Sequence, residues 1–164
     1  MKPSSLVAVD PGLNSMGYAM WSLRQPPLAS SVPPPHTVGL LKAPRRLELA
    51  ERARWLAHQL DETLDLNGGR GGVAFVSEYP AYHGSIRGWA TGDLQKLTFL
   101  VGVLAGYFER AVFDIVTPGG WKGQMSKDVV IRRLQKRFGP GATREWERDM
   151  WDAVGIGLWK LGQF

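Results

Sequence analysis

The sequence predicts an α/β domain with a mixed five-stranded sheet, three antiparallel strands followed by two parallel ones, flanked by helices. Short continuous apolar runs at residues 6–9 and 73–77 are typical of strands that are buried on both faces of a sheet. Segments 45–66 and 94–108 instead carry apolar residues at three- and four-residue steps, the period of helices that bury one stripe. This alternation of strand-like and helix-like segments favours the α/β class.

The elements follow one another in a simple order. The first strand stops at the turn signal Asp10-Pro11-Gly12. Residues 25–36 are too rich in proline for a sheet interior and are expected to form an exposed loop. The predicted elements are strands at 6–9, 17–23 and 37–41, a helix at 45–66, a strand at 73–78, a helix at 94–108, a strand at 112–116, and helices at 126–138 and 143–161, with a break at 117–120 and a helix end at 139–141.

Composition narrows the class of protein. A chain of 164 residues with 44% hydrophobic residues is long enough for one domain, which we expect to span residues 1–164. No apolar run approaches the roughly 18 to 20 residues that cross a bilayer, and the N-terminus lacks a signal-peptide pattern, so we expect a cytoplasmic protein. The absence of cysteine excludes disulfides, thiolate metal sites and a cysteine nucleophile. The net charge of +5 favours a polyanionic partner.

Four carboxylates stand where the predicted fold gathers them. Asp10 and Glu78 each end a buried strand, so both lie at the carboxyl edge of the sheet if these strands are parallel neighbours. Asp149 and Asp152 are three residues apart and share one face of the last helix, which continues into apolar Ile156 and should turn toward the sheet. Such hard oxygen ligands suit Mg²⁺ or Mn²⁺, and four of them can hold two ions about 3.5 to 4 Å apart for phosphodiester hydrolysis.

Each acid also has a simpler interpretation. Asp10 can be a turn aspartate before Pro11-Gly12, and Glu78 can end its strand by chance. Asp149 and Asp152 can be solvated members of a charged helix. A shared site is favoured because these simpler interpretations require several independent coincidences.

Three blocks of sequence carry a family resemblance. The blocks 7–18 (with Asp-Pro-Gly followed by Gly-Tyr), 73–78 and 149–158 are similar to the opening strand and turn, the second acidic strand and the terminal acidic helix of the RuvC-type Holliday junction resolvases. Residues 94–106 resemble the dimer-interface helix of that family, and residues 117–127 resemble its basic segment beside the site. The loops 25–36 and 79–89 depart from the shortest cellular members and favour a divergent phage or bacterial relative.

The resemblance implies a ribonuclease H-like fold and a homodimeric endodeoxyribonuclease that resolves four-way DNA junctions during recombination and repair, in the cytoplasm of a prokaryotic or phage-infected cell. Paired cuts require two equivalent sites, which a twofold dimer supplies. The resemblance implies that Asp10, Glu78, Asp149 and Asp152 are catalytic residues and the ligands of two Mg²⁺ or Mn²⁺ ions. It also implies that Lys122 and Lys127 contact the scissile region, and we count Lys127 as catalytic too. Gly102 and Gly106 can permit close helix approach or serve packing within the chain.

Two segments offer side chains for DNA. Between residues 122 and 137, six basic residues stand against one acid, a candidate phosphate-binding surface, although the residues from 132 onward can equally form a solvated helix face. The loop after Glu78 combines aromatic and basic residues with glycines, which suits stacking on an unpaired base, with Tyr82 as the predicted wedge. The predicted DNA-binding residues are Lys122, Lys127, Tyr82, His83, Arg87 and Arg132. Trp89 and Trp121 also fit structural packing.

Two other functions fit the same residues. Other ribonuclease H-like nucleases share the acidic skeleton, so the substrate can be other branched DNA or RNA in RNA/DNA hybrids. A catalytically silent module that binds junctions is disfavoured by the intact set of acids.

Overall fold

The computed structural model describes residues 3–24, 32–66, 72–80 and 92–164, and within them the chain forms a five-stranded sheet in the order β3-β2-β1-β4-β5. The strands are β1 (Ser5–Pro11), β2 (Ser15–Ser22), β3 (Thr37–Lys42), β4 (Val73–Glu78) and β5 (Val112–Val116). β2 is antiparallel to both β1 and β3, whereas β4 is parallel to both β1 and β5. The predicted mixed sheet of three antiparallel strands followed by two parallel strands is therefore confirmed.

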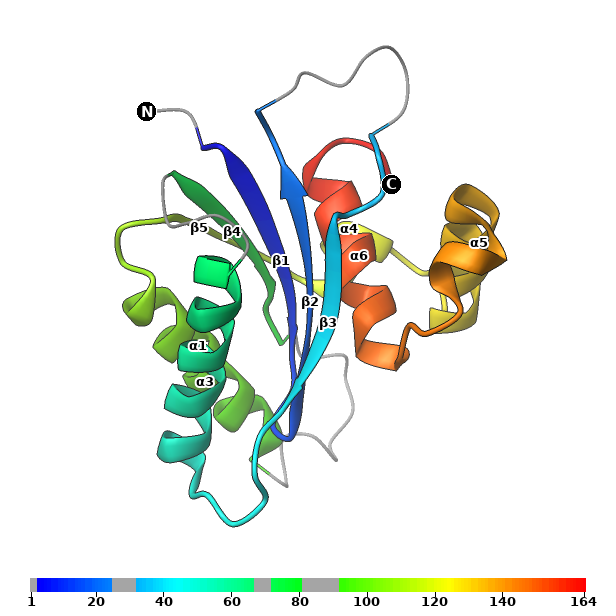
Figure 1. The fold of residues 1–164 in the computed structure, drawn as a ribbon. Coiled ribbons are helices and arrows are strands. Elements are labelled where there is room, and N and C mark those ends of the chain that lie inside the picture. Colours follow the sequence, from blue (N-terminus) through cyan, green and yellow to red (C-terminus); the bar gives the residue numbers. More distant parts are fainter. Residues whose placement is uncertain (1–2, 25–31, 67–71, 81–91) are drawn as a thin grey trace.

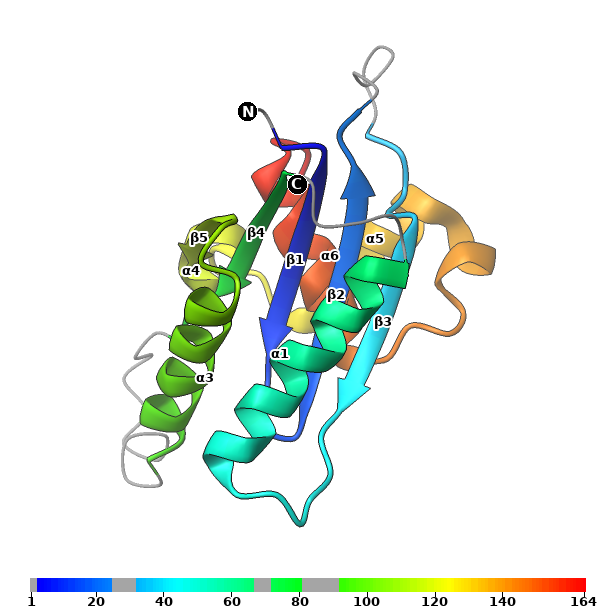
Figure 2. The ribbon, with the colours of Figure 1, turned by 60° about the vertical axis from the view of Figure 1, so that its left-hand side comes forward.

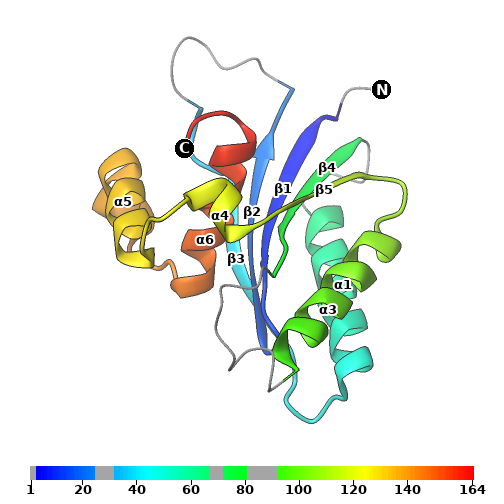
Figure 3. The ribbon, with the colours of Figure 1, turned by 180° about the vertical axis from the view of Figure 1, so that it is seen from behind.

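Helices cover both faces of this sheet (Figures 1 and 2). One face carries α1 (Leu49–Leu66) and α3 (Asp93–Tyr107), and the other carries α4 (Pro118–Lys122), α5 (Lys127–Thr143) and α6 (Arg148–Lys160). Of this second group, α6 packs directly on β1 and β2, while α5 packs on α6 and stands farther from the sheet (Figure 3).

The central strand β1 explains why the apolar runs of the sequence do not alternate with polar residues. Leu6 and Ala8 belong to the core on the α6 side, and Val7 and Val9 belong to the core under α1 and α3. Successive side chains of a strand point to opposite faces, so a strand covered on both sides needs apolar residues at every position.

Three boundaries differ from the sequence prediction. Residues 118–122 form the short helix α4 instead of only breaking the chain, because the Thr117 side chain accepts a hydrogen bond from Gly120 N at 3.2 Å and Pro118 suits the first helical turn. The predicted helix end at residues 139–141 agrees with the structure: the backbone of Gly139 leaves the helical region, at φ 80° and ψ 160°, and a second short helical stretch, included in α5, continues to Thr143. α6 begins at Arg148, five residues later than the predicted start at residue 143, and α1 begins at Leu49 instead of residue 45.

Close contact between α6 and the sheet depends on residues without side chains. A Cβ added to Gly17 of β2 would lie 2.1 Å from the Asp149 carbonyl oxygen, and one added to Gly157 of α6 would lie 2.1 Å from the Trp21 ring. Real carbon atoms do not approach so closely, so both positions require glycine for the helix to rest on the strands as it does.

We predict that Gly17→Ala destabilises the fold by about 1 to 3 kcal/mol or more, because the new methyl group meets the backbone of α6, which cannot move without losing its own packing. Urea denaturation of the variant measures this. Gly141→Ala is the matched control, since the exposed helical Gly141 has nothing within 4 Å of an added Cβ and gains about 0.5 to 1 kcal/mol at most. Equal stability of the two variants would contradict the close approach.

Candidate active site

Two of the predicted acids lie side by side at the edge of the sheet. The parallel pairing of Val9 with Ser77 places Asp10 and Glu78 at the next level of β1 and β4. Alternation along each strand puts both side chains on the α6 face, since Leu6 and Ala8 of β1 and the corresponding residues of β4 belong to the core on that side. The two carboxylates therefore point into the same layer, between the sheet and α6.

The other two acids come to this edge on the first turns of α6. Gly17 is the partner of Asp10 across the β1–β2 pair, and the backbone of Asp149 lies directly over it. Asp152 is only 5% exposed, one turn farther along the helix. The amino end of a helix carries partial positive charge and favours carboxylates in its first turn. The fold thus brings together acids that are up to 142 positions apart, since 152 − 10 = 142.

Two lysines meet the acids from the segment that follows β5. Lys127, the first residue of α5, places its Nζ 2.7 Å from Asp152 Oδ2 and 3.9 Å from Asp149 Oδ1. Lys122, at the end of α4, places its Nζ 4.0 Å from the same oxygen of Asp152. Both lysine side chains are largely buried, at 19% and 20% exposed, so their charges are poorly screened by water. They supply the positive charge that lets acids gather in a partly buried place.

Two uncharged side chains donate hydrogen bonds to Asp149 and Glu78. Ser15 Oγ, at the start of β2, donates to Asp149 Oδ2 at 2.7 Å, and the Trp121 indole nitrogen, on α4, donates to Glu78 Oε2 at 2.6 Å. Neither contact is predicted from the sequence, which indicates no function for Ser15 and only a packing role for Trp121. Both contacts join residues more than 40 positions apart, so no local pattern signals them.

Burial and neighbouring carboxylates raise the pKa values of Asp10 and Glu78. Desolvation by burial raises the pKa of Asp10 well above its usual 3.8, and the charges of Glu78 and Asp152 raise it further, while Lys127 opposes them. Burial also raises the pKa of Glu78, against the hydrogen bond from Trp121 and the charge of Lys122. These influences place the acids within electrostatic reach of one another.

The donor set suits a hard cation. Asp152 Oδ1 is buried and accepts no hydrogen bond from any described residue, an expensive situation for a carboxylate oxygen unless a cation completes its coordination. All four acids offer oxygen, the ligand that Mg²⁺ and Mn²⁺ prefer. No three His, Asp or Glu side chains among the described residues already stand in a metal-binding arrangement, and an ammonium group, that of Lys127, contacts Asp152 instead.

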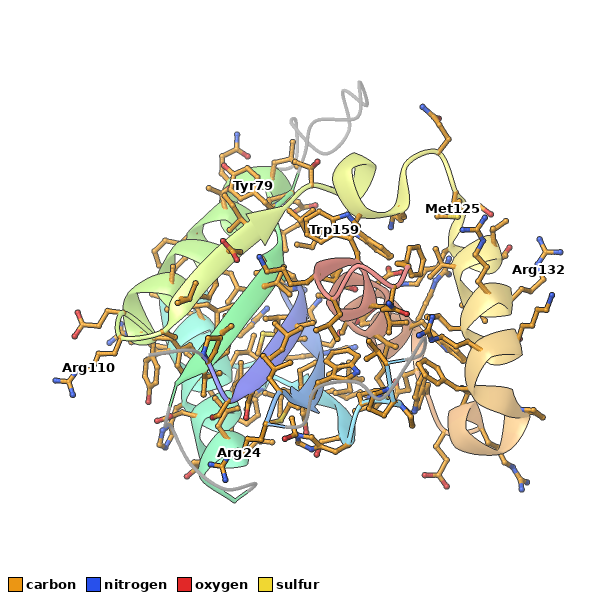
Figure 4. The ribbon with its side chains drawn as sticks, turned by 90° about the horizontal axis from the view of Figure 1, so that it is seen from above. Arg24, Tyr79, Arg110, Met125, Arg132 and Trp159 are labelled. Carbon is orange, nitrogen blue, oxygen red and sulfur yellow. The ribbon has the colours of Figure 1, made fainter. Side chains whose placement is uncertain are left out.

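The remaining predicted DNA-binding residues fall into two groups. Arg132 lies on α5, is exposed and points away from the body of the molecule (Figure 4). Tyr82, His83 and Arg87 lie outside the described residues, in the segment that follows Tyr79 at the end of β4.

Comparison with known proteins identifies the fold. No protein-family model and no curated protein matches the sequence. Among solved structures, RuvC of Thermus thermophilus superposes with a TM-score of 0.68 at 15% identity, covering 97% of each chain. RuvC of the same organism in complex with a Holliday junction substrate gives a TM-score of 0.68 at 14% identity over 94% of this chain and 90% of that one. The yeast mitochondrial Holliday junction resolvase Ydc2 gives 0.62 at 15% identity over 97% and 78%.

These similarities in structure cover nearly the whole chain, although the sequences are only 14% to 15% identical. The strand order and directions described above are those of a ribonuclease H-like sheet. The chain therefore has the ribonuclease H-like fold of the RuvC-type resolvases.

Proposed function

We propose that the protein is an endodeoxyribonuclease that resolves four-way DNA junctions by metal-dependent phosphodiester hydrolysis. The observation that carries this proposal is the gathering of Asp10, Glu78, Asp149 and Asp152 at one edge of the sheet, around a buried Asp152 oxygen without a hydrogen-bond partner among the described residues. Similarity of fold to two junction resolvases, one of them solved with its junction, supports the choice of substrate.

In this proposal the four acids are the ligands of two Mg²⁺ or Mn²⁺ ions. When bound, such ions activate a water for attack on the phosphorus and stabilise the leaving 3′-oxygen. The chain contributes the geometry: the strand ends fix Asp10 and Glu78, and the first turns of α6 fix the two other acids. Lys127 and Lys122 contact Asp152 in the free protein. In the proposed reaction they would stabilise the negative charge that develops at the scissile phosphate.

DNA contacts extend outward from this edge. Arg132 on the exposed side of α5 offers a phosphate contact at a distance from the acids. Tyr82, His83 and Arg87 belong to the segment that leaves β4 immediately after Glu78, and we propose that they contact the DNA near the cut, with Tyr82 stacking on a base. No helix in the described part of the chain is long and apolar enough to cross a membrane, and we propose a cytoplasmic location, where the DNA is.

We also propose that two copies pair through α3, because a symmetric junction needs two equivalent cuts. Phe99 is 43% exposed, a large fraction for such an apolar side chain. Gly102 and Gly106 follow Phe99 at three- and four-residue steps on the same stripe of α3, and nothing in the described part of the chain comes within 4 Å of a Cβ added to either. This stripe is open for a second helix to approach.

Our first test of function is cleavage of four-way junction, fork, duplex and RNA/DNA hybrid substrates with Mg²⁺ or Mn²⁺. We expect paired cuts in the junction. We expect Asp10→Asn to abolish cleavage while junction binding persists, because the variant loses a metal ligand but keeps every basic side chain. Glu145→Gln, which neutralises an exposed acid near α6, should cut normally. If the protein cuts only RNA/DNA hybrids, its substrate is RNA and not the four-way junction. If the wild type binds junctions without metal and does not cut them, it is a catalytically silent junction-binding module.

A second prediction concerns stability. The folded pKa of Asp10 is raised, so the folded chain holds this proton more tightly than the unfolded chain and loses stability as pH rises from about 3.8 through the raised value. In EDTA at neutral pH, Asp10→Asn should therefore melt higher than the wild type, by about 2 to 4 °C for each kcal/mol gained. The difference should shrink as the pH falls toward 4, while Glu145→Gln stays close to the wild type. A lower melting temperature for Asp10→Asn at neutral pH would contradict the burial of this charge.

The dimer is tested by mass in solution. Sedimentation or light scattering should give twice the mass of the 18.2 kDa chain for the wild type and the mass of one chain for Phe99→Lys, because a charge in the contact would be buried without a partner. Ile115→Lys, at a residue of β5 that is 57% exposed, is the control and should remain dimeric. A dimeric Phe99→Lys would place the contact elsewhere.

A further inference from the structure

Trp121 contacts one proposed metal ligand in a way that packing alone does not require. Its indole nitrogen donates to Glu78 Oε2 at 2.6 Å, a short contact between a fixed aromatic donor and a charged acceptor. Indole groups of the same core serve as comparisons: the nitrogen of Trp21 is buried and has no hydrogen-bond partner among the described residues, and that of Trp151 donates to the backbone oxygen of Trp146. The core thus tolerates a buried indole without a carboxylate partner. Packing alone therefore does not explain why the Trp121 indole nitrogen points at Glu78.

The ring of Trp121 is held firmly. The residue is 3% exposed, and its six-membered ring lies where a Cβ on Gly155 of α6 would come within 2.5 Å. Phe164 contacts the ring edge-on, with 5.4 Å between centroids, and α4 is anchored at its start by the side-chain cap of Thr117. A donor with so little freedom keeps the carboxylate it contacts in one orientation.

The place of Trp121 in the fold follows from β5. Val116 pairs with Glu78 at the end of the sheet, and Tyr79 N donates to Val116 O at 2.7 Å, so the end of β4 is tied to the strand that leads into α4. One short helix later, the indole reaches back to Glu78. The strand pairing therefore fixes the backbone at Glu78, and the indole fixes its carboxylate.

We propose that Trp121 is a positioning residue, whose indole N–H fixes one oxygen of the Glu78 carboxylate so that the other oxygen is oriented for a divalent cation before the cation arrives. This inference depends on the metal-dependent function proposed above. Outer hydrogen bonds of this kind typically change metal affinity about 10- to 100-fold.

The test is isothermal titration of Mn²⁺ into the metal-free protein, without DNA. Trp121→Phe keeps most of the ring but removes the donor, and should weaken Mn²⁺ binding about 10-fold. Trp21→Phe is the matched control: it shrinks an equally buried indole whose nitrogen bonds to nothing in the described part of the chain, and it should lower the melting temperature in EDTA without weakening Mn²⁺ binding. Wild-type affinity in Trp121→Phe, or equal weakening in both variants, would overturn the inference.

A measurement on the wild type covers the case in which Trp121→Phe does not fold. In a ¹H–¹⁵N spectrum, the indole resonance of Trp121, assigned through its contact with Phe164, should shift on titration with Mg²⁺, whereas that of Trp21 should not. A Trp121 resonance that stays in place while other resonances move would refute the positioning role alone. A wild-type chain that binds neither Mn²⁺ nor Mg²⁺ would instead contradict the metal-dependent function itself.

Discussion

The direct contact between the first turn of α6 and β2 is the constraint on which the acid cluster depends. Because residue 17 lacks a side chain, the backbone at Asp149 rests on the strand opposite Asp10. A side chain at residue 17 would lift the amino end of the helix and carry Asp149 and Asp152 away from the strand ends. Gly155 and Gly157 likewise permit close packing farther along α6, where the ring of Trp121 from α4 and that of Trp21 from β2 occupy the space a side chain would need. The geometry of the acid cluster is thus set by backbone packing, which is less adaptable than side-chain packing.

Gathering acids at one place carries an electrostatic cost, and the surrounding residues reduce it in different ways. Lys127 lies in hydrogen-bond contact with Asp152, and Lys122 adds a weaker attraction at 4.0 Å. Ser15 and Trp121 add no charge but fix the orientation of the carboxylates they contact. Asp10 is the least compensated of the acids, because burial and then the charges of Glu78 and Asp152 raise its pKa while Lys127 lowers it. A site that costs stability in this way is expected where function, and not folding, has selected the residues.

Much of the fold could be predicted from sequence because its signals are local. The buried runs that end in Asp10 and Glu78 predicted two core strands, and the pairing of β1 with β4 then places the acids together. The start of α6 could not be predicted so well, since residues 143–147 have a helix-like composition but include a turn and the residue that caps the helix. α4 was missed because Pro-Gly-Gly resembles a turn in sequence. The partners of Ser15 and Trp121 were inaccessible for a different reason: each bond joins segments that only tertiary packing brings together.

The wide separation of the acids along the chain has a consequence for synthesis. A polypeptide emerging from the ribosome displays Asp10 and Glu78 long before it contains Asp149 and Asp152. α6 is the last described helix and the one that packs on the central strands, so the proposed nuclease would stay inert until the final segment docks. Newly made and partly folded copies would then leave the DNA of the cell uncut.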